Sequence, residues 1–315
     1  MGGPSMSGEG MLPPRSERPG RKQPSRSQLA QRRLLAGGLL VVFFGLALWL
    51  GVSALGGSGG DDEAAPVATT AAPAAPVLRV VFPEGYDRDQ MVARIGEVRK
   101  IAIGRRKITP KLNAKGYRAA TEAAKLPQQF RADARGIEGF LFPATYEFTA
   151  STTAKQLVGD QLEFFGQNFA KVDLRESKKK NLTPYDVLII ASMVEKETIA
   201  PDERPKVAAV IYNRLKAGMP LGIDATIRYG LKVPGTEALR VSQLESDNPY
   251  NTRNRTGLPP TPIANPGLAS MQAAAHPADV DFLFFVRKPD RIHHFFTASE
   301  DEFYAKACEY GFGCN

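Results

Sequence analysis

Three parts of the chain differ in their pattern of hydrophobic and polar residues. Residues 34–55 are a run of 22 positions without a charge. As a helix, such a run spans about 33 Å, enough to cross a bilayer core of roughly 30 Å. Residues 1–33 and 56–77 lack hydrophobic periodicity and are rich in Gly, Pro and small residues. We therefore expect a disordered tail, a transmembrane helix and a flexible linker before a folded part that begins at residue 78.

Charges on either side of the apolar run predict its orientation. Seven Lys and Arg residues precede it, and Asp61, Asp62 and Glu63 follow it. Positive flanks stay in the cytoplasm, so the carboxyl-terminal part is expected to be exported. A cleaved signal peptide is the alternative, since Val52–Ala54 resembles a cleavage site. Its apolar region is normally only about 7–15 residues long, which favours an uncleaved anchor.

The folded part is predicted to be α+β. A strand is expected at 78–82, and helices at 88–99, 153–170 and 202–217. Two apolar runs at 282–286 and 293–296, separated by a polar turn, predict a hairpin. We expect two units here, a small one over 78–135 and a larger mixed helix and strand domain over 136–315.

The most informative helix is predicted to begin at Pro184, capped by Thr183. Its residues 187–194, VLIIASMV, are apolar on every side, which is typical of a helix buried in a domain. The helix ends in Glu195 and Glu197. Burial raises the pKa of a carboxyl group, and a raised pKa is how a general acid is made at neutral pH. The alternative is that both glutamates are surface charges at a fraying helix end.

The two glutamates cannot share a face of the helix, because two residues correspond to about 200° of rotation. One can therefore point into a cleft while the other forms an ion pair inside the protein. The helix pattern alone does not say which of the two points into the cleft.

Composition excludes several classes of protein. The net charge is +8, but residues 1–33 contribute +5, which leaves about +3 for the folded part and argues against a nucleic-acid-binding domain. The chain has three histidines and no HExxH motif, so no metal and no other cofactor is expected. Its two cysteines, Cys308 and Cys314, either close a small disulfide loop outside the cytoplasm or remain free thiols.

Eight short motifs resemble the endolytic murein transglycosylase family, also called MltG or YceG-like. They are EGFLFPATYEF (138–148), ASMVEKET (191–198), KVAAVIYNRL (206–215), DATIRYG (224–230), PYNT (249–252), GLPPTPIANPG (257–267), AAAHP (273–277) and HHF (293–295). The resemblance covers roughly residues 80–315. It implies a bacterial single-pass membrane protein whose exported domain cleaves peptidoglycan glycan strands near the synthases (penicillin-binding proteins). It also implies that 78–135 is a reduced LysM-like subdomain and that 136–315 is the catalytic domain.

The resemblance implies that Glu197 is the catalytic residue. We then expect Glu195 to pair with a basic residue such as Arg214 instead of doing chemistry. We expect substrate contacts from a further set of polar and aromatic residues in these motifs: Glu138, Tyr146, Asp224, Tyr250, Asn251 and Thr252. An asparagine can bind an N-acetyl group, and tyrosines can pack on sugar faces. Each of these residues has a structural role as its alternative, and Asp224 is equally suited to forming a loop.

The expected reaction gives 1,6-anhydro-N-acetylmuramic acid ends and terminates the elongation of new strands. A hydrolytic muramidase and a non-catalytic peptidoglycan-binding module are the alternatives. A penicillin-binding acyl enzyme is disfavoured. The chain carries matches to S-x-x-K at 177–180 and to S-D-N at 246–248, but it has no K-T-G.

Overall fold

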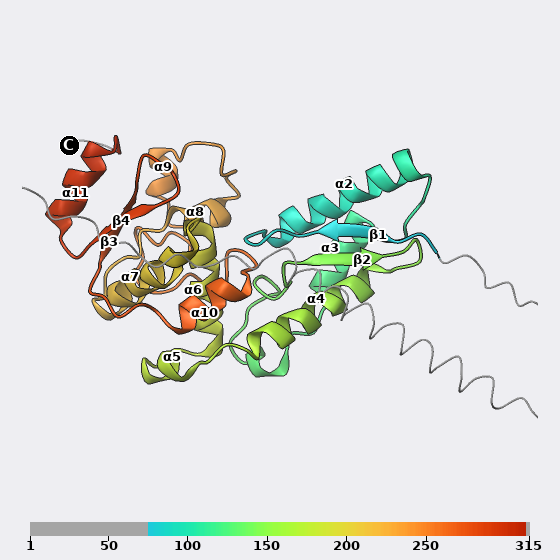
Figure 1. Ribbon diagram of the computed structural model, residues 1–315, viewed down its shortest axis with the longest axis horizontal. Coiled ribbons are helices and arrows are strands. Elements are labelled where there is room, and N and C mark those ends of the chain that lie inside the picture. The colour runs from blue at the N-terminus through green and yellow to red at the C-terminus, as the bar shows by residue number, and fades with distance from the viewer. Residues whose placement is uncertain (1–74, 313–315) are drawn as a thin grey trace, which may run out of the picture. The chain divides into compact units, whose positions relative to one another are not determined.

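The computed structural model describes residues 75–312, which combine helices with two short antiparallel sheets (Figure 1). This is the α+β composition that the sequence predicts. None of the helices within 75–312 is both long and apolar enough to cross a membrane. The predicted tail (1–33), membrane span (34–55) and linker (56–77) lie outside the described residues, apart from residues 75–77.

The first sheet pairs two strands that are far apart in the sequence. Strand β1 (Leu78–Val81) lies antiparallel to β2 (Thr145–Phe148), with Val80 opposite Tyr146. Two helices lie between them in the chain, α2 (Arg88–Arg106) and α3 (Ala114–Glu122), and α4 (Ala154–Phe169) follows β2.

This pairing crosses the expected boundary at residue 135. The core beneath the sheet also takes aromatic rings from both sides of that boundary, because Phe82 and Tyr117 pack against each other while Phe130 packs against Phe140 and Phe165. Residues 78–169 therefore share one sheet and one set of buried rings. The LysM-like character of 78–135 stays a prediction.

Helix α6 (Pro184–Glu197) lies at the centre of the remaining part. Its start is as predicted, because the Thr183 side chain accepts a hydrogen bond from the backbone of Asp186 and the Asp186 carboxylate accepts one from the backbone of Thr183. Residues 187–194 are buried without exception. The helices that pack most extensively against α6 are α7 (Arg204–Lys216) and α10 (Leu268–Ala275).

The predicted hairpin is confirmed as β3 (Phe284–Arg287) and β4 (His294–Thr297), followed by α11 (Glu300–Glu309). The remaining elements are short: η1 (Gln128–Phe130), α5 (Arg175–Lys179), η2 (Pro201–Glu203), α8 (Asp224–Leu231) and α9 (Val241–Leu244). The segments between them bring several motif residues close to the end of α6.

Gly139 allows one such close approach. Its φ of +90° lies in a region that residues with a side chain avoid. A Cβ at this position would lie 2.7 Å from the Pro262 ring, so the 138–148 motif can touch the 257–267 motif only with glycine here.

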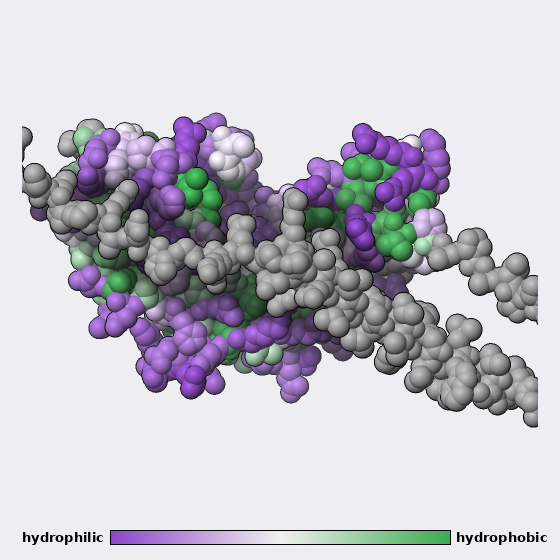
Figure 2. All heavy atoms as spheres, in the orientation of Figure 1, coloured by the Kyte–Doolittle hydropathy of each residue, from purple (hydrophilic) through white to green (hydrophobic). Residues whose placement is uncertain are grey.

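The visible surface is mostly hydrophilic, with some hydrophobic residues over β1 and α2 (Figure 2). Val81 and Ile101 are among the exposed hydrophobic residues of these two elements. Scattered surface residues of this kind are ordinary in soluble domains, so they do not by themselves mark a site.

Candidate functional site

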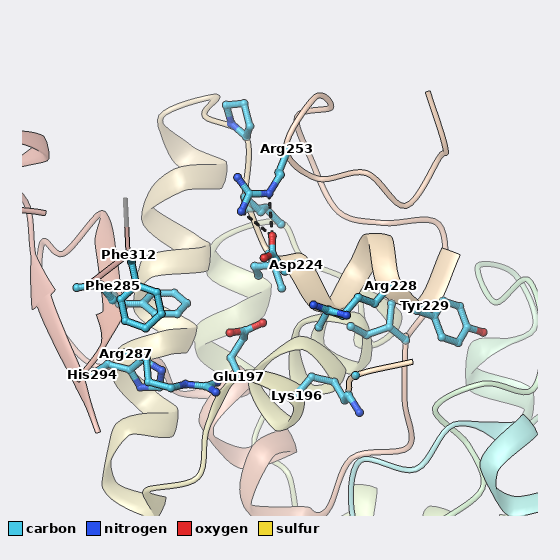
Figure 3. A pocket seen from close by; sticks show the side chains of 18 of the residues that line it. Lys196, Glu197, Asp224, Arg228, Tyr229, Arg253, Phe285, Arg287, His294 and Phe312 are labelled. Carbon is cyan, nitrogen blue, oxygen red and sulfur yellow. Dashed lines mark hydrogen bonds and ion pairs between the residues drawn. The ribbon is translucent and has the colours of Figure 1, made fainter. Parts of the chain in front are cut away.

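A cleft of about 1980 Å³ opens at the carboxyl end of α6 (Figure 3). Its walls come from the end of α6, the amino end of α8, the β3–β4 hairpin and α11, with α2 contributing at one edge. Elements from four separate regions of the sequence therefore line one cleft with the last residue of a buried helix. An open cleft of this size is the place where a ligand is expected to bind.

Glu197 is that last residue, and its carboxyl group points into the pocket (Figure 3). The side chain is partly exposed to the cleft, but the surrounding protein removes most of its hydration. This desolvation raises the pKa of Glu197 to about 7, opposed by the positive charges of Arg287 and Lys196 and reinforced by Asp224. The group is therefore divided between its acid and base forms near neutral pH, as a general acid–base catalyst requires.

Glu195 points the other way, as the helical rotation predicts. Its side chain is 7% exposed, accepts a hydrogen bond of 2.9 Å from the backbone N–H of Gly267, and lies 4.0 Å from Arg204. The ion-pair partner is thus Arg204 rather than Arg214. Arg204 opens α7 beside the start of α10, whereas Arg214, near the end of α7, donates to backbone carbonyl groups such as that of Leu283.

Asp224 lines the cleft with Glu197. It is the first residue of α8, and its carboxylate accepts a hydrogen bond of 2.7 Å from Arg253 in a partly exposed ion pair (Figure 3). Its negative charge is one of the groups that raise the pKa of Glu197. The structure therefore brings these two predicted site residues together.

Asn251 and Thr252 directly precede Arg253 in the chain, and both are buried. The Asn251 amide donates hydrogen bonds of 2.8 Å to two backbone carbonyls, those of Leu244 and Ser246. The Thr252 hydroxyl accepts a hydrogen bond from the backbone N–H of Ile223, directly before Asp224. Both side chains thus hold the loops that place Asp224 and Arg253, and neither lines the cleft.

Glu138 and Tyr250 do not line the cleft, but both contact Tyr229, which does line it. The Tyr229 hydroxyl donates a hydrogen bond of 3.1 Å to Glu138, and its ring packs edge-on against Tyr250 at 5.1 Å between centroids. Glu138 is buried, and desolvation raises its pKa to about 7. Its carboxyl group also accepts hydrogen bonds from the Arg88 backbone and the Asn265 side chain.

Tyr146 lies away from the cleft. It is buried on β2, its ring lies near those of Phe82 and Phe164, and its hydroxyl donates a hydrogen bond of 2.8 Å to the carbonyl of Phe142. These contacts give it a place in the core of residues 78–169.

The sequence reasoning missed the aromatic and basic wall of the cleft. Phe285 and Arg287 from β3, and Tyr304 and Phe312 from α11 and the turn after it, all line the pocket. Tyr304 and Phe312 are largely exposed, so their rings are open to a ligand in the cleft. The only available signal was the HHF motif, which marks the neighbouring strand.

Two further expectations concern His and Cys residues. Within residues 75–312, no group of three or more His, Cys, Asp or Glu side chains is placed to hold a metal ion. Cys308 takes part in a disulfide, and its expected partner, Cys314, lies outside the described residues.

Comparisons with known proteins agree with the resemblance. The YceG-like family model matches residues 63–309. An endolytic murein transglycosylase of Bacillus subtilis is 40% identical over 154 residues, which cover 48% of this chain and 42% of the relative. An enzyme of the same name from Streptococcus pneumoniae is 31% identical over 243 residues, covering 72% of this chain and 42% of the relative.

The chain thus spans less than half the length of these curated relatives. The crystal structure of a yceG-like protein from Listeria monocytogenes is similar in fold, with a TM-score of 0.60 and 30% identity, over 72% of this chain and 75% of that one. Since the family model covers most of the chain and the motifs follow one another in order, the chain belongs to the YceG-like family.

Proposed function

We propose that the protein is a lytic transglycosylase that cleaves inside peptidoglycan glycan strands. The observation that carries this proposal is Glu197, a carboxyl group with its pKa raised to about 7, placed at the floor of an open cleft. The names of the relatives from Bacillus subtilis and Streptococcus pneumoniae support the substrate class.

In the proposed reaction, protonated Glu197 gives its proton to the oxygen between N-acetylmuramic acid and N-acetylglucosamine. The C1–O bond to that oxygen breaks, and the 6-hydroxyl of the same muramic acid closes on C1. The Glu197 carboxylate takes the proton from that hydroxyl and returns to its starting form. The products are a free 4-hydroxyl and a 1,6-anhydro sugar, so no water is consumed.

One carboxyl group is sufficient because the nucleophile is already part of the substrate, which reduces the entropic cost of bringing it to C1. Ordinary glycosidases need two carboxyl groups. The second carboxylate near the floor of this cleft, Asp224, is engaged by Arg253 at 2.7 Å. That pairing favours a role for Asp224 in tuning Glu197 and holding the cleft wall over a role as nucleophile.

The remaining predicted contacts belong to the same proposal. Asp224 lies where it can touch a bound sugar, while Tyr250 and Glu138 would act at the cleft edge through Tyr229. Asn251 and Thr252 would act by holding the loops around Asp224. For Tyr146, packed in the core, a structural role is the better supported of its two alternatives.

The cellular setting is also a proposal. We infer that the chain is anchored in the bacterial cell membrane by residues 34–55, with its amino terminus in the cytoplasm and its cleft outside. An enzyme held there by the linker 56–77 would reach new strands beside the peptidoglycan synthases and terminate their elongation. The support is the charge pattern around residues 34–55 and the resemblance to the family.

Mass spectrometry of purified glycan strands tests the reaction. The full-length chain, with detergent in all samples, is expected to release fragments ending in 1,6-anhydro-N-acetylmuramic acid. The Glu197→Gln variant is expected to release none. Glu245→Gln is the matched control, since Glu245 is exposed and does not line the cleft, and it should behave as the unaltered chain.

Each alternative has its own outcome. Fragments with reducing ends would identify a hydrolytic muramidase. Strand binding without any cleavage by the unaltered chain would identify a non-catalytic module. Anhydro products from Glu197→Gln at the normal rate would refute the role of Glu197.

A further inference from the structure

Arg287 differs from the other basic residues of the cleft in having no partner among the described residues. It is the last residue of β3, is exposed, and lines the pocket. Within residues 75–312 its side chain forms no hydrogen bond and no ion pair. The other arginines and lysines that line the cleft are all engaged: Lys196, Arg214, Arg228, Lys232 and Arg253.

The strand opposite Arg287 is held firmly. Arg287 pairs with His294 in the β3–β4 register. The Glu203 carboxylate accepts hydrogen bonds from both the backbone N–H of His294, at 2.9 Å, and its ring Nδ1, at 2.7 Å. Both side chains are almost fully buried. The hairpin is thus held by hydrogen bonds to the start of α7, and Arg287 extends from a strand whose position these contacts fix.

Arg287 also lies close enough to Glu197 to affect it. Its positive charge is the largest of the influences that lower the pKa of Glu197 against desolvation. In Figure 3 the Arg287 side chain extends along the pocket floor toward Glu197. A free cation beside a group that must hold a proton works against catalysis, and a bound anion would neutralise that effect.

We propose that Arg287 forms a carboxylate-binding subsite beside Glu197, which receives the acidic substituent of the muramic acid sugar. This inference rests on the proposed function. A guanidinium suits this ligand because its planar fork matches a carboxylate with two parallel hydrogen bonds. Two sources offer the same chemistry, the lactyl carboxylate of a sugar without a peptide and the carboxylates of an attached peptide stem.

Binding to the Glu197→Gln variant of the full-length chain tests the subsite without turnover. Three ligands of equal length are compared: strands stripped of peptides, which expose lactyl carboxylates; strands with intact stems; and neutral N-acetylglucosamine oligomers. Adding Arg287→Gln is expected to weaken binding of at least one carboxylated ligand by about 10–100-fold, the range for a charge-assisted pair. Binding of the neutral oligomer should change by less than about twofold.

Arg291→Gln is the control, because it removes the same charge from the turn of the same hairpin and Arg291 does not line the cleft. Arg287→Lys should retain part of the affinity, since it keeps the charge but loses the fork. Weaker binding of stripped strands alone would identify the lactyl carboxylate as the group that Arg287 binds. Weaker binding of stem-bearing strands alone would identify a carboxylate of the peptide stem.

An equal loss for all three ligands, or no loss for either carboxylated ligand, would overturn the subsite. Neither result depends on cleavage, so failure of the subsite is distinguishable from failure of the proposed reaction. In the chain with Glu197 intact, Arg287→Gln should raise KM for the affected strand more than it lowers kcat.

Discussion

At the scale of single residues, the position of one carboxyl group decides what the cleft can do. Glu197 ends a helix buried on all sides, and desolvation is the first cause of its raised pKa. Glu195, two residues earlier, faces Arg204 and the amide of Gly267 instead. The rotation between neighbouring helix positions thus separates a carboxyl group that faces the cleft from one that is held inside the protein.

The raised pKa of Glu197 makes the proposed activity pH-dependent. The reaction begins with the protonated acid, whose fraction falls once the pH exceeds a pKa of about 7. We therefore expect kcat/KM for strand cleavage to fall about tenfold per pH unit well above pH 7. Initial rates of anhydro-product release from pH 5 to 9 measure this, and a flat profile up to pH 9 would contradict it.

The same pKa predicts how Glu197→Gln changes stability. A carboxyl group whose pKa is higher in the folded state is neutral in both the folded and the unfolded state below pH 4.5. Its burial therefore does not lower the free energy of unfolding in that pH range. The cost of ionisation grows between pH 4.5 and 7 and is complete above pH 7. Glutamine removes this cost, so the variant should gain on the order of 1–3 kcal/mol of unfolding free energy at pH 8, allowing for partial exposure.

Urea unfolding at pH 4.5 and pH 8 measures this gain for Glu197→Gln, with Glu245→Gln as the control. The difference from the unaltered chain should be small at the lower pH and stabilising at the higher one. A gain of the same size at both pH values would show that ionisation of Glu197 is not its cause.

At the scale of elements, local signals predict some parts of the fold and leave others out. The capped start of α6 and the β3–β4 hairpin follow from residues next to one another in the chain. Strand β2 was not predicted, because its partner β1 lies more than sixty residues earlier and pairing over that distance leaves no local pattern. Helix α3 has only nine residues, too short a stretch for its amphipathic pattern, with Tyr117 and Thr121 buried one turn apart, to stand out in the sequence.

The residues of the candidate site also divide into those that local motifs predict and those that only the folded structure brings together. Glu197 was found because its motif is contiguous, and Asp224 because it lies in a second motif. Arg287, Phe285 and Tyr304 come from the hairpin and α11, and only the packed structure brings them to the end of α6. Asn251 and Thr252 were identified as possible sugar contacts, but their polar groups bind backbone atoms of neighbouring loops.

A hydrogen bond from α6 to a neighbouring loop can be tested at this scale. The Ser192 hydroxyl accepts a hydrogen bond of 3.0 Å from the backbone N–H of Ile263 and donates to the carbonyl of Ile189. Ser192→Ala leaves the buried N–H of Ile263 without this partner. The expected loss is about 1–3 kcal/mol of unfolding free energy, despite the better helix propensity of alanine.

Urea unfolding at one pH measures that loss, with Ser242→Ala as the control in the exposed helix α9. The control removes a hydroxyl that forms no comparable buried contact and should change stability by less than about 0.5 kcal/mol. Equal stability of Ser192→Ala and the unaltered chain would mean that the loop of Ile263 finds another partner.

At the scale of the whole described part, Asn265 joins three distant segments. Its backbone N–H donates to the carbonyl of Tyr86, and its side-chain oxygen accepts a hydrogen bond of 2.9 Å from the backbone of Leu141. Its amide nitrogen donates to both Tyr86 and Glu138. Residues near 85, 140 and 265 are thus held together by one buried side chain, close to the start of α10 and the cleft edge at Tyr229.

This junction makes Asn265→Asp an informative change, because it keeps the shape and alters one group. The new carboxylate would still accept the hydrogen bond from the backbone N–H of Leu141. The Asn265 amide nitrogen lies 2.8 Å from the Glu138 carboxyl group, and the oxygen that replaces it would have no hydrogen to donate to Glu138. Two carboxylates at that distance inside a protein cannot both be ionised cheaply. We expect a loss of about 3–5 kcal/mol of unfolding free energy at pH 8.

The loss should shrink as the pH falls, since a proton shared between the two carboxyl groups restores a donor. Urea unfolding at pH 8 and pH 5 measures this, with Asn254→Asp in an exposed loop as the control for added charge. Burial already raises the pKa of Glu138 to about 7, so the relief should begin near neutral pH and not near pH 4. A loss of equal size at both pH values would instead indicate that it comes from the lost hydrogen bond to the Tyr86 carbonyl, and not from charge at Glu138.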